Sequence, residues 1–160
     1  MIHIAPEDPA REDVSQLLDE HLADMFATSP AESVHALDHS ALSGPAVTFW
    51  TAREDGQLLG CGALKEIEPR AGEIKSMRTA PDARGRGVAS LMLTHIVAEA
   101  RRRHFGRLAL ETGSEAFFEP ARRLYSRHGF VECGPFADYV LDPHSIFMSL
   151  DLDGGVAAQP

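Results

Sequence analysis

Apolar residues recur at two different spacings along the chain, and these spacings predict both helices and strands. A helical stripe follows Asp8-Pro9, which is a typical helix start because Asp can accept hydrogen bonds from free backbone amides and Pro fits the first helical position. The stripe consists of Val14, Leu17, Leu18, Leu22 and Met25. A second start signal at residues 29–32 predicts a short helix to about residue 40. The chain is therefore expected to open with two helices.

The centre of the chain carries the pattern of strands. A β-rich run at 47–51 and an apolar run at 58–67 flank Asp55-Gly56, a dipeptide typical of hairpin turns. Residues 73–79 predict a third strand, 88–100 an amphipathic helix and 107–112 a further strand. A strand, a helix and a strand in this order form a βαβ unit with a parallel pair. A helix over 114–128 and strands over 131–133 and 145–150 complete the pattern.

This order predicts an α/β (α+β) fold, with a central mixed sheet whose N-terminal half is antiparallel and about four flanking helices. The 160 residues predict a single domain over 1–152 and a mobile polar tail over 153–160. No apolar run reaches the length of a membrane span, and the first residues lack the pattern of a signal peptide, so a cytoplasmic protein is expected. The net charge of −9 argues against a nucleic-acid surface.

A glycine-rich turn between the third strand and the following helix is the strongest chemical signal. The first turn of a helix has backbone N–H groups without intrahelical acceptors, and the helix dipole favours an anion there. Gly85 and Gly87 allow a phosphate to approach the main chain closely, and Arg84 and Arg86 add positive charge. The turn therefore predicts a pyrophosphate site, although such a turn can also be a plain strand-to-helix connection.

Two motifs resemble signatures of the GNAT superfamily of N-acetyltransferases. Arg84, Gly87 and Ala89 fill the defined positions of its pattern Gln/Arg-x-x-Gly-x-Gly/Ala. The run from Ala121 to Phe130 is similar to its second signature, Ala-x-x-Leu-Tyr-x-x-x-Gly-Phe. The resemblance covers about residues 3–152, is closest to the bacterial YsnE-like subgroup and implies a GNAT-like fold with a βαβ acyl-CoA-binding core.

The resemblance implies acetyl-CoA as co-substrate and an amine as acceptor. In that family, the strand before the loop binds the pantetheine arm, and the loop amides bind the pyrophosphate. Carried over to this chain, the co-substrate site comprises Met77, Arg78, Thr79, Arg84, Gly85, Arg86, Gly87, Val88 and Ala89. Dimers through a sheet edge are frequent in the family, so the resemblance leaves a homodimer open.

Three residues are candidates for the general acid or the general base. Tyr125 stands at the signature tyrosine, which often acts as general acid toward the CoA sulfur in the family; the alternative is a tyrosine that only packs on the sheet. Glu73 lies eleven positions before Arg84, the spacing of the general base in some relatives, or it pairs with Lys75 or Arg78 instead. Glu111, at the end of the next strand, is the second candidate for the base.

His35 and His39 are four residues apart in the short second predicted helix. Such spacing is found among metal ligands, but no third ligand is evident in the sequence, so no metal is expected. In the family this region commonly borders the acceptor pocket, which gives the two histidines a role in shaping the pocket or relaying a proton. Plain surface histidines are the alternative.

Together these features predict an acetyl-CoA-dependent N-acetyltransferase that acts directly on a small-molecule amine, such as an amino acid or a polyamine. Three other functions stay open. A non-catalytic acyl-CoA sensor would keep the loop without needing Tyr125 or Glu73. A lysine or N-terminal amine of a protein could be the acceptor. A phosphate-ester binding protein would not distinguish acetyl-CoA from simple nucleotides.

Overall fold

A computed structural model describes residues 1–34 and 40–153 and contains a seven-stranded mixed sheet. The strand order is β1-β2-β3-β4-β5-β7-β6. The strands are β1 (His3–Pro6), β2 (Val47–Glu54), β3 (Gln57–Glu68), β4 (Ala71–Thr79), β5 (Arg107–Gly113), β6 (Val131–Cys133) and β7 (Ser145–Asp151). All neighbours are antiparallel except β4 and β5. The mixed sheet with an antiparallel N-terminal half is therefore confirmed.

The helix count is slightly lower than the predicted four. The described residues contain the α-helices α1 (Glu12–Thr28), α2 (Val88–Arg102) and α3 (Glu119–Arg127) and four one-turn 3-10 helices, η1 (Ala31–Ser33), η2 (Ala41–Ser43), η3 (Pro81–Ala83) and η4 (Ala116–Phe118). In the described part of the predicted second helix only η1 is present, since Ser29 is an extended C-cap of α1 and Val34 is extended again; residues 35–39 lie outside the described residues. The helix predicted from 114 begins at Glu119, with Pro120 in its first turn.

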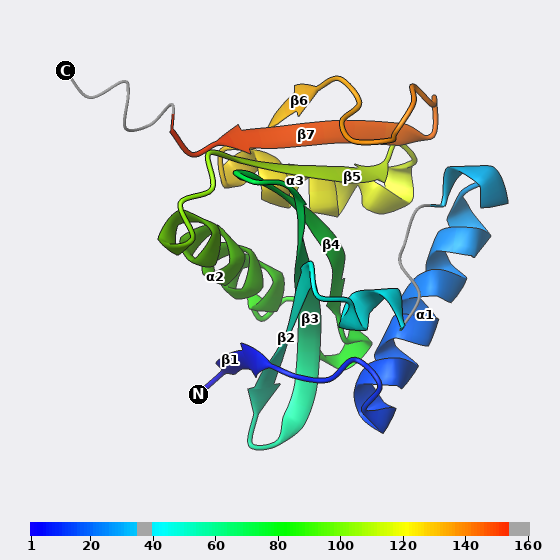
Figure 1. The fold of residues 1–160 in the computed structure, drawn as a ribbon. Coiled ribbons are helices and arrows are strands. Elements are labelled where there is room, and N and C mark those ends of the chain that lie inside the picture. The colour runs from blue at the N-terminus through cyan, green and yellow to red at the C-terminus, as the bar shows by residue number, and fades with distance from the viewer. Residues whose placement is uncertain (35–39, 154–160) are drawn as a thin grey trace.

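Helices cover both faces of the sheet (Figure 1). On one face, Val14, Leu17 and Leu18 of α1 pack against Phe49 and Cys61. On the other face, α2 and α3 cover a larger apolar core, which includes Met92 and Ile96 of α2. Burial of these stripes is the main stabilisation of the fold. Within the described residues, no helix combines the length and the apolarity that a membrane span needs.

The sheet opens between β4 and β5, and this opening creates the site. The two strands pair only at their beginnings, where Ala71–Glu73 face Arg107–Ala109. Beyond this point they diverge, as Figure 1 shows. Ser76 of β4 has a φ of 56°, and the pairing with β3 shifts between Cys61 and Ala63. A bulge of this kind bends a strand, so the second half of β4 turns away from β5.

Candidate active site

The glycine-rich turn forms the expected cradle at the start of α2. Gly87 is the N-cap of this helix with a φ of 77°, and Gly85 has a φ of 79°. A Cβ atom added at either glycine would meet nothing within 4 Å, so open space lies directly over the main chain. The free amides of the first turn of α2 face this end of the helix. The local geometry therefore suits a bound phosphate group.

A cavity of about 520 Å³ runs from this cradle along the space between α2 and α3. Of the nine residues predicted to bind the co-substrate, eight line it: Met77, Arg78, Thr79, Arg84, Gly85, Gly87, Val88 and Ala89. Arg86 is the exception, since its guanidinium pairs with Glu54 at the end of β2. The guanidinium of Arg78 also turns away from the loop and donates to Asp24 of α1 at 2.6 Å.

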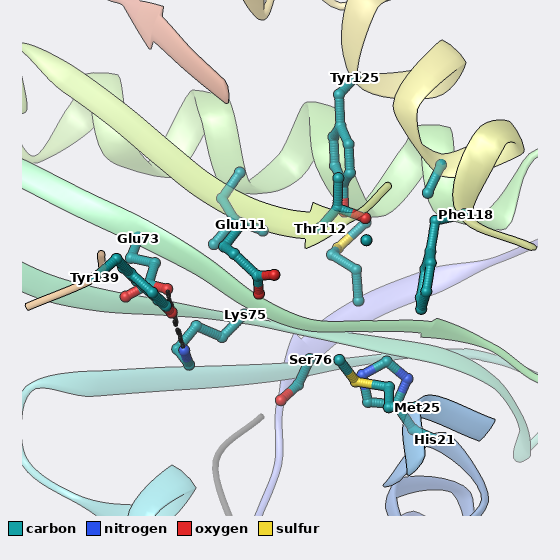
Figure 2. A pocket seen from close by; sticks show the side chains of 14 residues that line it. His21, Met25, Glu73, Lys75, Ser76, Glu111, Thr112, Phe118, Tyr125 and Tyr139 are labelled. Carbon is teal, nitrogen blue, oxygen red and sulfur yellow. Dashed lines mark hydrogen bonds and ion pairs between the residues drawn. The ribbon is translucent and has the colours of Figure 1, made fainter. Parts of the chain in front are cut away.

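A second cavity, of about 100 Å³, lies in the opening between β4 and β5 (Figure 2). Residues 73–77 of β4, residues 111–113 of β5, Tyr125 and Tyr139 line it. Figure 2 shows Tyr125 reaching in from α3, while His21 and Met25 come from α1 on the other side. Met77 and Tyr125 line both cavities, so the two spaces meet there. A ligand held at the cradle could therefore extend into the opening of the sheet.

Tyr125 is buried at the meeting point of the cavities, with 7% of its surface exposed. Its ring stacks edge-on against Phe130, with 5.8 Å between the ring centroids. Burial raises the pKa of the Tyr125 phenol above its ordinary value, and the charge of Glu111 adds to this effect. The phenol therefore keeps its proton at neutral pH.

Glu73 lies in a buried cluster with Lys75 and Tyr139. Lys75 Nζ donates to Glu73 Oε2 at 3.0 Å and is 3.0 Å from the Tyr139 hydroxyl, which also donates to Glu73 (Figure 2). Only 4% of Glu73 and 9% of Lys75 are exposed. The pairing of Glu73 with Lys75 that the sequence left open is present. Tyr139 completes the cluster from the loop between β6 and β7, which is far in sequence from both motifs.

Glu111 has the electrostatic character of a general base. Burial raises the pKa of its carboxyl group to about 7, and the negative charges of Glu73 and Asp142 act in the same direction, whereas Lys75 lowers it. Figure 2 shows the carboxyl group pointing into the cavity on the side of Lys75. A base with a pKa near the working pH is most effective in accepting protons.

His21 is a lining residue that sequence reasoning missed, because it lies within the apolar stripe of the first helix. Burial and the nearby Arg78 lower the pKa of His21 to about 4, so its imidazole is neutral at physiological pH. His35 and His39 lie outside the described residues, and their predicted role stays a prediction. Within 1–34 and 40–153, no three side chains of the metal-binding types come together.

Comparison with known proteins agrees with this geometry. Residues 14–130 match the Acetyltransferase (GNAT) family. The chain is 52% identical to the uncharacterized N-acetyltransferase YsnE of Bacillus subtilis, over 94% of this chain and 100% of that protein. It is 40% identical to the IAA acetyltransferase of Azospirillum brasilense, over 94% of this chain and 98% of that protein. A GNAT family acetyltransferase from Elizabethkingia anophelis, whose crystal structure has acetyl-CoA bound, shares the fold with a TM-score of 0.68. The two sequences are 16% identical, and the match covers 94% of this chain and 98% of that chain.

Proposed function

Since the chain belongs to the GNAT family of N-acetyltransferases, we propose that it transfers an acetyl group from acetyl-CoA directly to the primary amine of a small molecule. The observation that carries this proposal is the pair of Tyr125 and Glu111 at one opening of the sheet. One side chain holds a proton and the other can accept one. Direct transfer to an amine needs both abilities within one cavity.

The chain offers a fitting site for the co-substrate. The amides at Gly87 and Val88 would hold the pyrophosphate, because the glycines leave their main chain open to contact. Met77 and Thr79 of β4 line the same cavity and would bind the pantetheine arm. Acetyl-CoA supplies an acetyl group activated as a thioester. A main-chain amide near Met77 would polarise its carbonyl group.

The protons balance between the two side chains and the acceptor. The acceptor enters as an ammonium ion and gives one proton to Glu111, which leaves the nitrogen lone pair free for attack. The new C–N bond forms as the C–S bond breaks. Tyr125 protonates the departing thiolate. It then regains a proton from the acetylated nitrogen, which must lose a second proton to become a neutral amide. The products are a neutral amide and free CoA thiol, and Glu111 releases its proton to solvent before the next turnover.

Two carboxylates compete for the role of the base. Glu73 was the first candidate from the sequence, and it remains one because it lines the cavity. We favour Glu111, since Lys75 and Tyr139 already donate to Glu73 Oε2 and occupy that oxygen.

The test is turnover with a panel of amines. Purified protein is incubated with acetyl-CoA and with monoamines, polyamines, amino acids and lysine peptides, and released thiol and product mass are recorded. The name of the Azospirillum relative adds IAA to the panel. Acetylated small amines, together with a loss of turnover in Tyr125→Phe at unchanged acetyl-CoA affinity, would support the proposal. Binding of acetyl-CoA without transfer to any compound would favour a sensor instead.

A further inference from the structure

The cavity between β4 and β5 is poor in positive charge on the side where the acceptor must enter. Among the described residues that line it, Lys75 is the only lysine or arginine. Its Nζ lies 3.0 Å from the carboxylate of Glu73, so the two charges offset each other. The remaining ionisable carboxyl group of the lining is Glu111. Across the described residues that line the cavity, the acceptor side is therefore neutral or negative.

A further carboxylate strengthens this bias. Asp142, in the loop between β6 and β7, is fixed by the hydroxyl of Ser33 at 2.6 Å and by the amide of His144 at 2.8 Å. Its negative charge reaches Glu111, where it disfavours the ionised carboxylate. An acceptor in the cavity would experience the same field.

Nearby cations on neighbouring elements already contact other groups. Arg78 donates to Asp24 at 2.6 Å and lies on the α1 side of β4. Arg122 donates to the backbone carbonyl groups of Gly113 and Glu115, at 2.6 and 3.0 Å. Among the described residues, a carboxylate on the acceptor would thus lose its hydration without gaining a cation, and buried charges without partners are strongly disfavoured.

From this charge distribution we infer that the acceptor is a cationic amine without a carboxylate group, such as a diamine or polyamine, and that the site rejects free α-amino acids. The inference rests on the proposed function and narrows its substrate class. The ammonium ion would enter next to Glu111. Glu73 would act as a specificity residue, because it occupies the one lysine that could otherwise bind a carboxylate.

Two matched pairs of substrates test the inference. 1,4-Diaminobutane differs from ornithine only by the α-carboxylate, and 1,5-diaminopentane differs from lysine in the same way. We expect kcat/KM to favour each diamine at least tenfold. Equal or better use of the amino acids would overturn the inference while leaving acetyl transfer to amines intact. If no amine of the wider panel is acetylated, the proposed function itself fails.

The variant Glu73→Gln provides the decisive second measurement. It keeps the size of the side chain but removes the charge that neutralises Lys75. We expect the preference for 1,4-diaminobutane over ornithine to fall several-fold, because Glu73 then no longer offsets the positive charge of Lys75. Glu66→Gln, at an exposed position of β3, removes the same charge from a residue that does not line the cavity and serves as control. An unchanged preference in Glu73→Gln would contradict the role assigned to Glu73.

Discussion

The substitution Glu111→Gln should lower activity and raise stability at the same time. Gln has nearly the same shape as Glu but cannot ionise. Burial raises the pKa of Glu111 from 4.5 to about 7, so a charged carboxylate at this position is a cost to the folded state. Loss of the carboxylate removes this cost, and it also removes the proposed base.

The magnitude follows from the difference between the two pKa values. Between pH 4.5 and 7, the folded chain keeps a proton on Glu111 that the unfolded chain has released. The free energy of unfolding therefore falls as pH rises through this window, by up to about 3 kcal/mol at 1.36 kcal/mol per pKa unit. At pH 8 the Gln variant should be more stable than the natural chain by up to this amount. At pH 4.5 the two should be nearly equal.

Urea unfolding at pH 4.5 and pH 8 measures this difference, with Glu66→Gln as the exposed control. In parallel, kcat/KM for an accepted amine is recorded against pH. The natural chain should lose activity below about pH 7, where Glu111 becomes protonated. The Gln variant should lose this acid limb together with roughly 10²–10⁴-fold in kcat.

Two results would refute the reasoning. Equal stability of the two chains at pH 8 would mean that Glu111 ionises without cost, so that burial does not govern its pKa. Full activity of the Gln variant with an unchanged pH profile would mean that another group accepts the proton. In that case Glu73 becomes the base to test.

Three further outcomes are expected. Tyr125→Phe should reduce kcat by roughly 10²–10⁴-fold while acetyl-CoA affinity, measured by calorimetry, stays within about twofold; an unchanged kcat would exclude Tyr125 as the acid. Gly87→Ala places a Cβ on a residue with a φ of 77°, so we expect a cost of about 1–2 kcal/mol in thermal unfolding and weaker acetyl-CoA binding. Arg78→Met removes a charge that lowers the pKa of His21, so NMR titration should show this pKa rising above about 4; a constant value would leave burial as the only cause.

The co-substrate side of the site could be predicted from the sequence because its signals are local. The glycines at 85 and 87, the strand before them and the helix after them follow one another in the chain, and the structure places them around one cavity. Tyr125 could be predicted as a residue near the co-substrate for the same reason, because it belongs to a second contiguous motif. The helix start signal at 29–32 was less reliable, since the described residues that follow it, up to residue 34, form a single 3-10 turn.

The acceptor side depends on contacts between distant segments and was largely hidden. Tyr139 reaches Glu73 across 66 positions, and His21 enters from the first helix without any motif around it. The positive φ of Ser76 gave no signal either, because serine is not a residue type that marks such a conformation. The edge strand β1 is only four residues long, which is too short for a clear alternation of apolar and polar positions.

The opening between β4 and β5 has a consequence for how such an enzyme can diversify. The cradle at residues 84–90 lines only the larger cavity, whereas Met25 of α1 and Tyr139 of the loop between β6 and β7 line only the cavity in the opening. Substitutions in α1 or in the loop between β6 and β7 can therefore change which amine fits without disturbing the cradle at the start of α2. On the proposed function, the cradle at the start of α2 is the constant part of the site, and α1 with the loop between β6 and β7 is the part that can vary. Libraries for directed evolution toward new amines should therefore concentrate on these two segments.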